Sequence, residues 1–358
     1  MIAATEPESS PAAPAKKPAG GHGGRLQRRL FLASLWLSLA LLLAGCRRAP
    51  APRPPTFAPD ESALAATLPW TVQEQRFPAR PGADARGIAV DARGTVYLAA
   101  GSGVRVYGPD GALRRAWSTR APAQCIAVGT SGRIYVGMIG LVTVFDPDGK
   151  VLARWRSPAP AAPAWRMITD IAVREPDVFV SDAGLRCVIH FAMNGDVVGA
   201  IARRDPDNGE PGLLVPSPHL GCAAAPGNRL LVANPGKRQV QTRSFTGKLL
   251  GAFGRSGLNP GAFSGCCNPV RVAWISSPGP AVATAEKGVR RIQVFSLEGA
   301  LLAYIGAGHF ARTPPALALA TGTDGSLYVL DPPGNRILRF HFARKSLPAS
   351  GQAHAAER

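Results

Sequence analysis

Residues 87–117 read GIAVDARGTVYLAAGSGVRVYGPDGALRRAW, a pattern that returns along much of the chain. Four short runs rich in β-branched and aromatic residues are separated by glycine-containing turns, one of them the Pro-Asp-Gly turn at 109–111. Such runs joined by tight turns are typical of antiparallel strands. The stretch therefore predicts one four-stranded antiparallel sheet.

The same order of strands and turns recurs six times. The first strands of the units begin near positions 88, 126, 171, 223, 272 and 317, at intervals of 38, 45, 52, 49 and 45 residues. One such sheet cannot bury both of its faces, whereas six sheets stacked radially bury them and leave only short edges. We therefore predict an all-β fold, a six-bladed β-propeller over residues 70–343.

The last unit has only three strands, which end at about Ala343. The segment Trp70–Phe77 reads WTVQEQRF, alternates as a strand does, and precedes the first complete unit. We expect this segment to supply the missing outer strand and to close the ring. Residues 344–358 are polar and are predicted to form a disordered tail.

The composition supports a packed domain rich in turns. Hydrophobic residues make up 46% of the 358 positions, which excludes wholesale disorder. The 40 glycines and 34 prolines argue against a helical bundle. The net charge of +18 is large, but most of it is arginine in a chain also rich in alanine, proline and glycine. The charge alone therefore does not indicate a polyanionic partner.

The N-terminal segment resembles an export signal. Basic residues precede an apolar run of 15 residues, Leu30–Ala44, which is shorter than the roughly 20 residues that a membrane-spanning helix needs. The run ends in Leu-Ala-Gly-Cys46, which resembles the bacterial lipobox. This resemblance implies a signal peptide over residues 1–45, cleavage before Cys46, and lipid on its sulfur. An uncleaved signal anchor is the alternative.

The same segment contains a pair of arginines, Arg28 and Arg29, followed by Leu-Phe-Leu. This resembles the twin-arginine motif, which exports proteins already folded, often with a cofactor. A general secretory signal is the alternative. Residues 46–69 are rich in proline and alanine and are predicted to be a stiff linker. The location expected is the cell envelope, on the extracytoplasmic, periplasmic side of a membrane, where a nucleic-acid partner is not expected.

The turns between second and third strands carry a second resemblance. The segments are Asp182-Ala183-Gly184, Asn234-Pro235-Gly236, Glu286-Lys287-Gly288 and Asp331-Pro332-Pro333-Gly334-Asn335-Arg336-Ile337. They resemble the Asp-x-Gly-Asn-x-Arg-Ile segment of NHL repeats. Together with Cys-Cys-Asn-Pro at 266–269 they are similar to exported bacterial NHL propellers. This implies a six-bladed propeller and no particular chemistry, since propellers include binding platforms, scaffolds, hydrolases and lyases.

Four cysteine positions are expected near one face of the propeller. Cys125, Cys222 and the pair Cys266-Cys267 come just before or at first strands, and Cys187 begins a third strand after a turn on the same face. Adjacent α-carbons are roughly 3.8 Å apart, so a bond within the pair would be strained and reducible. Cys222, Cys266 and Cys267 could instead bind a soft metal, Cu or Zn. Buried structural cysteines are the third interpretation.

Basic residues also gather at this face. They are Arg186, Lys237, Arg238, Lys287, Arg290 and Arg291, with Glu286 neutralising part of the charge. Cations around a channel mouth concentrate anionic ligands, although arginines at strand starts are often structural. His190, His219, His309 and His341 are scattered and are interpreted as surface or packing residues.

Two functions are therefore open. The first is a membrane-tethered binding or scaffold platform for a protein or an anionic envelope glycan, with Lys237, Arg238, Lys287 and Arg290 making contacts. The second is a metal-dependent or redox enzyme that uses Cys266 and Cys267, with Cys222 as a third member. The sequence contains no Gly-x-Ser-x-Gly elbow, phosphate-binding loop or dinucleotide-binding motif, and this favours the platform.

Overall fold

The structure is a computed structural model in which residues 60–156, 167–311 and 316–346 are described. The chain divides into two units, Met1–Phe57 and Ala58–Arg358, and the description concerns the second. The signal-peptide prediction, with Arg28 and Arg29, lies outside the described residues, as do Cys46 and most of the predicted linker. Within the described parts of the chain, no helix is both long and apolar enough to cross a membrane.

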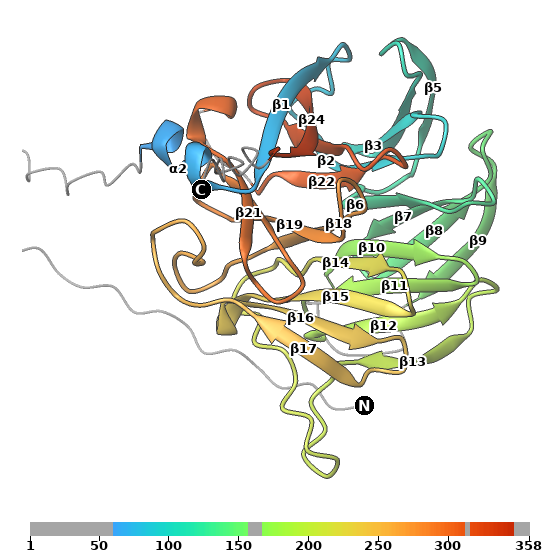
Figure 1. Ribbon diagram of the computed structural model, residues 1–358. Coiled ribbons are helices and arrows are strands. Elements are labelled where there is room, and N and C mark those ends of the chain that lie inside the picture. The colour runs from blue at the N-terminus through green and yellow to red at the C-terminus, as the bar shows by residue number, and fades with distance from the viewer. Residues whose placement is uncertain (1–59, 157–166, 312–315, 347–358) are drawn as a thin grey trace, which may run out of the picture. The chain divides into compact units, whose positions relative to one another are not determined.

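Six antiparallel sheets of four strands form the blades of a propeller. The innermost strands, β2, β6, β10, β14, β18 and β22, lie side by side around the centre, and β22 contacts β2 to complete the ring (Figure 1). The prediction of six four-stranded blades in a closed ring is therefore confirmed.

The first three blades follow the chain directly, numbered from the channel outward. Blade 1 contains β2 (Ala85–Val90), β3 (Val96–Ala100), β4 (Gly103–Tyr107) and β5 (Leu113–Ser118). Blade 2 contains β6 (Cys125–Val128), β7 (Ile134–Met138), β8 (Leu141–Phe145) and β9 (Val151–Arg156). Blade 3 contains β10 (Ile168–Arg174), β11 (Asp177–Asp182), β12 (Cys187–Ala192) and β13 (Val197–Ile201).

The remaining blades include the one that joins the two ends of the domain. Blade 4 contains β14 (Cys222–Ala225), β15 (Arg229–Asn234), β16 (Gln239–Ser244) and β17 (Leu249–Phe253). Blade 5 contains β18 (Arg271–Ile275), β19 (Ala281–Ala285), β20 (Ile292–Phe295) and β21 (Leu301–Ile305). Blade 6 contains β22 (Ala318–Thr321), β23 (Leu327–Asp331), β24 (Arg336–Arg344) and β1 (Trp70–Phe77), with short 3-10 turns at η1 (Pro235–Lys237) and η2 (Ala307–His309).

The N-terminal strand closes the ring as predicted. β1 pairs antiparallel with β24 in a continuous register from Trp70 opposite Arg344 to Phe77 opposite Ile337. Trp70 and Phe77 are buried, while most residues between them are exposed. The last strand extends to Arg344, one residue into the range predicted as tail. The two ends of the domain are therefore held in one blade.

A short helix that the sequence analysis did not predict precedes this strand. Helix α2 (Glu61–Thr67) lies within the stretch interpreted as a linker, and Asp60 caps it by accepting a hydrogen bond from the Ala63 amide at 3.1 Å. Glu61 accepts a bond from the Ala307 amide at 3.0 Å, and the Lys345 ammonium donates to the carbonyl of Ala65. The end of the predicted linker is thus attached to the domain.

The hydrophobic core lies between neighbouring blades. One cluster joins Leu231 and Val240 of blade 4 to Val272, Val282 and Phe295 of blade 5. Comparable clusters lie between the other pairs of blades, including blades 6 and 1. Each blade buries both faces against its neighbours, which is why a single unit of the repeat could not fold alone.

Candidate functional site

The functional candidates lie on one face of the propeller, which we call the loop face. On this face each inner strand begins and each turn between second and third strands lies. The register shows this for blade 4, where Cys222 at the start of β14 pairs with Val232 near the end of β15, and Asn234 pairs with Gln239 across the turn. The loop face therefore gathers loops from all six blades around the channel.

The turns that resemble NHL repeats position these loops. Their leading residues are Asp182, Asn234, Glu286 and Asp331, all at most 2% exposed. Each accepts a hydrogen bond from a backbone amide in the loop before its own blade's inner strand. The donors are Met167 (3.2 Å), Leu214 (3.0 Å), Ser264 (2.7 Å) and Ala311 (2.9 Å). In these four blades the motif is therefore structural, and it shapes the loop face.

A cavity of about 320 Å³ opens at the mouth of the channel. Its polar lining consists of Arg86, Gln124, Thr169, His219 and Arg271. These residues lie in or just before the inner strands of blades 1 to 5, and Ala318 of β22 adds blade 6. Ring closure alone brings them together, because they are far apart in the sequence.

Arg271 and Asp170 form an ion pair beside this cavity. The Nη1 atom of Arg271 lies 3.5 Å from Oδ2 of Asp170, and the side chains are 11% and 20% exposed. Burial raises the pKa of the Asp170 carboxyl, and the positive charge of Arg271 opposes this rise. The same Nη1 donates to the Thr169 carbonyl, whereas Nε of Arg271 has no hydrogen-bond partner in the described parts of the chain.

His219 is held neutral at this position. Burial lowers its pKa to about 4, and the positive charges of Arg271 and Lys287 lower it further in the same direction. Its imidazole can therefore donate and accept hydrogen bonds at neutral pH. The sequence analysis interpreted His219 as a surface or packing residue and did not single out Arg271 or Asp170. Their only sequence signal is their position at the start of an inner strand.

Three of the cysteines are buried. Cys125 and Cys222 begin β6 and β14, and burial, aided by the negative charge of Asp170, raises the pKa of both thiols well above the usual range. Burial, with Asp182, raises the pKa of Cys187 to about 12. Thiols of this kind are unreactive and pack as small hydrophobic residues.

Cys266 and Cys267 differ from the other cysteines because they lie nearer the surface. Cys266 is exposed, Cys267 is half-buried, and both are free thiols. Cys222, by contrast, is buried and directs its thiol to the Phe179 carbonyl, 3.9 Å away. Among residues 60–156, 167–311 and 316–346, no three His, Cys, Asp or Glu side chains form a group that could hold a metal ion. The structure therefore does not assemble Cys222 with the pair as a metal-ligand set.

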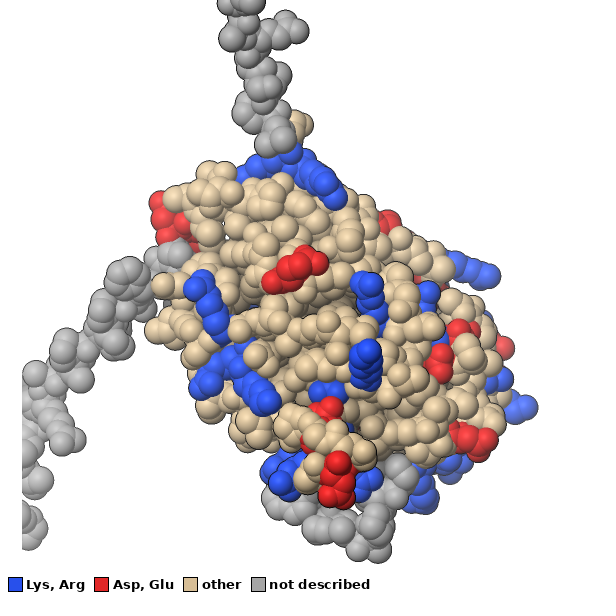
Figure 2. All heavy atoms as spheres, turned by 60° about the horizontal axis from the view of Figure 1, so that its bottom comes forward, with Lys and Arg blue, Asp and Glu red and all other residues tan. Residues whose placement is uncertain are grey.

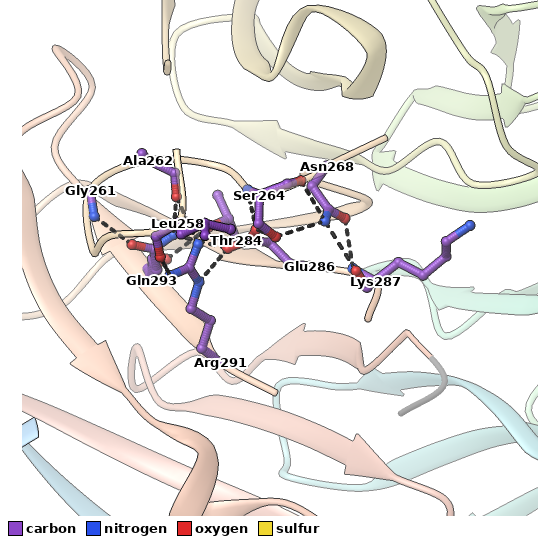
Figure 3. A network of polar contacts seen from close by, with 10 residues as sticks. All are labelled: Leu258, Gly261, Ala262, Ser264, Asn268, Thr284, Glu286, Lys287, Arg291 and Gln293. Carbon is purple, nitrogen blue, oxygen red and sulfur yellow. Dashed lines mark hydrogen bonds and ion pairs between the residues drawn. The ribbon is translucent and has the colours of Figure 1, made fainter. Parts of the chain in front are cut away.

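A buried polar network fixes the loop that carries this pair (Figure 3). Oε2 of Glu286 accepts bonds from the amide and the hydroxyl of Ser264, both at 2.7 Å. Its Oε1 accepts from Arg291 Nε at 2.5 Å and from Gln293 Nε2 at 3.1 Å. Asn268 donates to the Ser264 carbonyl at 3.0 Å and accepts from the Lys287 amide at 2.7 Å. The loop is thereby anchored on both sides of the cysteines.

The four predicted ligand-binding cations, Lys237, Arg238, Lys287 and Arg290, all lie on the loop face, and we call them the cationic rim. Arg238 donates to the Gly265 carbonyl at 2.9 Å, and Arg290 donates to the Ala307 and Phe310 carbonyls at 3.0 Å. These partners are neutral, and none of the four forms an ion pair with a described residue. Their charges are therefore uncompensated. Arg291, grouped with them from the sequence, is instead buried against Glu286.

Charge is not continuous over the surface. In the view of Figure 2, lysine and arginine side chains stand in separate groups on a mainly uncharged surface, with acidic groups between some of them. An anionic partner approaching this side would meet local cationic positions rather than one unbroken basic stripe.

Comparisons with known proteins identify the fold. No family model and no curated protein sequence matches the chain. A gluconolactonase from Xanthomonas campestris has a TM-score of 0.56 at 17% identity, over 79% of this chain and 93% of that one. A streptogramin B lyase structure has a TM-score of 0.51 at 11% identity, over 76% of this chain and 98% of that one.

A chain of a mitotic checkpoint complex is also similar, with a TM-score of 0.50 at 13% identity, over 75% of this chain and 93% of that chain. The similar structures thus include two enzymes and a member of a protein assembly. Identities this low establish the propeller fold and nothing about chemistry. The fold is consistent with a binding or scaffold role.

Proposed function

We propose that this protein is a membrane-tethered, extracytoplasmic binding platform whose loop face receives a protein or envelope glycan through its anionic groups. The observation that carries the proposal is the uncompensated charge of the cationic rim. Lys237 is exposed, and its neighbours in the rim are half-buried, each with charge facing no carboxylate partner among the described residues. Such a surface attracts anions and steers their approach.

The tether rests on the sequence. Lipid on Cys46 would hold the chain at a membrane, and the proline-rich residues that follow would space the propeller from it. Replacing Cys46 by alanine is expected to move the protein from the membrane fraction to the soluble periplasmic fraction. If Cys46→Ala remained with the membrane after a high-salt wash, the lipid tether would be wrong and the signal-anchor alternative would replace it.

The ligand-binding part is tested with a polymer of known charge. The full chain, solubilised in detergent, is titrated with polygalacturonate and with dextran as an uncharged polysaccharide. We expect binding of the acidic polymer only, weakening as salt rises. Lys237→Glu with Lys287→Glu should reduce the affinity at least about tenfold, since unfavourable charges then face the polymer.

The matched control is Arg154→Glu with Arg156→Glu. These two exposed arginines lie on the outer strand β9, so the same change in net charge occurs away from the loop face. Equal losses in both double variants would show that only net charge matters, and would refute a binding role for the rim.

One observation favours the alternative, a metal-dependent or redox enzyme. Cys266 and Cys267 are adjacent free thiols on a loop that a buried network holds in place. Elemental analysis and thiol titration of the purified protein separate the two functions. Stoichiometric Cu or Zn that is lost in Cys266→Ser with Cys267→Ser, in a protein that still folds, would overturn the platform in favour of the enzyme.

A further inference from the structure

The channel mouth holds a hydrogen-bond donor that the chain does not use. Arg271 lines the cavity, and its Nε is buried with no acceptor among the described residues, although its Nη1 is doubly engaged. Buried polar atoms in proteins almost always have a partner. The missing acceptor must therefore come from outside the chain, as a water molecule or as a ligand.

The lining of the cavity favours an anion as that partner. Arg86 and Arg271 are the charged residues that line it, and no carboxylate does. The nearest acid, Asp170, is paired with Arg271. Arg86 is exposed and forms no ion pair with a described residue. A guanidinium presents its donors in a planar fork that fits a carboxylate, which makes two such groups a suitable receptor.

The size of the cavity indicates more than a bare ion. Its volume of about 320 Å³ falls at the lower end of small-molecule sites, which run from roughly 300 to 1,000 Å³. Met167, Pro218 and several alanines supply apolar walls, and Gln124 and His219 supply polar groups. A second cavity of about 340 Å³ shares Met167 and Pro218 and continues toward Arg186. The site therefore has room for the body of an organic molecule beside its charged end.

We propose that the channel mouth binds a small organic acid, with its carboxylate held by Arg271 and Arg86 and its body lying against Met167 and Pro218. This goes beyond the tethered platform, because it requires neither a polymer nor the cationic rim. Gln124 and the neutral imidazole of His219 orient the bound molecule, because each can both donate and accept a hydrogen bond.

The experiment is calorimetric titration of the detergent-solubilised full chain with three acids and their neutral counterparts. The pairs are glucuronate with glucose, succinate with succinamide, and benzoate with benzamide; inorganic sulfate is the bare anion. At least one acid should bind saturably, about ten- to a hundredfold more tightly than its neutral counterpart, as charge-assisted hydrogen bonds predict. Sulfate should bind more weakly than that acid.

The variants separate this site from the rim. Arg271→Lys keeps a charge but removes the fork, and should weaken the acid at least about tenfold. Because this change also touches the pair with Asp170, Arg86→Gln and Gln124→Ala provide tests that leave the pair intact, and each should weaken binding severalfold. Arg154→Gln, on the outer strand β9, is the control that should change nothing. The rim variant Lys237→Glu with Lys287→Glu should retain most of the acid binding.

Three results would overturn the proposal. The first is saturable binding of none of the three acids, or equal binding of acids and neutral counterparts. The second is equal weakening by Arg86→Gln and Arg154→Gln. The third is binding of sulfate as tight as that of the best acid, which would leave a simple anion site without an organic ligand. None of these results bears on polymer binding by the rim, so each proposal fails separately.

Discussion

Removing the Glu286 carboxylate should release the loop that carries Cys266 and Cys267. Glu286 and Arg291 are 1% and 4% exposed at their side chains, and the carboxylate accepts four hydrogen bonds in all. Glu286→Ala leaves Arg291 with an uncompensated charge in the interior and leaves the Ser264 amide and hydroxyl without their acceptor. Breaking a buried pair by removing one partner typically costs about 3–5 kcal/mol.

The assay is hydrogen exchange of the backbone amides of Ser264 and Lys287, followed by mass spectrometry. A loss of about 3–5 kcal/mol corresponds to exchange faster by about a hundredfold to several thousandfold. Only the peptides covering these amides should respond fully, while amides in blade 2 should change little. Reaction of Cys266 and Cys267 with a thiol reagent should quicken in the same variant, because Asn268 no longer has a fixed Ser264 beside it.

Glu298→Ala is the matched control, since Glu298 is an exposed acid in a turn of the same blade. Its exchange should match that of the unsubstituted protein. The reasoning would be refuted if the Ser264 amide in Glu286→Ala exchanged within about threefold of the control, which is under about 1 kcal/mol. The buried pair would then not anchor the loop.

Three further predictions concern the fold and the channel mouth. The native pKa of His219 is lowered to about 4 from 6.5, so the unfolded chain binds a proton that the native state does not; the midpoint of urea unfolding should fall as pH drops through this interval, and His219→Gln should flatten that slope, whereas an unchanged slope would contradict the assigned burial. Trp70→Ala should cost about 3–5 kcal/mol of unfolding free energy, because this side chain is 6% exposed and packs where β1 closes the ring; exposed Thr71→Ala is its control, and equal melting temperatures would argue against closure by this strand. Gly149→Ala should destabilise by well over about 1 kcal/mol, because Gly149 has a positive φ of 87° and a Cβ there would lie 2.6 Å from the Trp117 ring, whereas Gly209→Ala, at φ 71° with open space around it, should cost less; the reverse order in thermal unfolding would exclude the steric argument.

The strand pattern and the turn chemistry could be predicted because both are local. Alternation in Trp70–Phe77 and the Pro-Asp-Gly turn act over a few residues, and they survive in the structure as β1 and as the hairpin between β4 and β5. Helix α2 was missed because it lies in a stretch dominated by alanine and proline, and its attachment depends on Ala307, far along the chain.

The cysteines show where reasoning from position alone stops. The sequence placed them near one face, and the structure does so too, but burial separates Cys125, Cys187 and Cys222 from the exposed Cys266. Burial depends on what packs over a residue, and this is not encoded next to it. For the same reason Arg291 could not be distinguished from the cationic rim until its contact with Glu286 was seen.

The repeat by itself determined the closed ring, since each sheet has two apolar faces and only neighbours on both sides can cover them. The tertiary structure alone decided the channel mouth. Thr169 and Arg271 are 102 positions apart, and their contact exists because β10 and β18 begin at the same end of the channel. A side chain's charge is written in the sequence, but its partner, its exposure and its pKa are set by residues that only closure of the ring brings near.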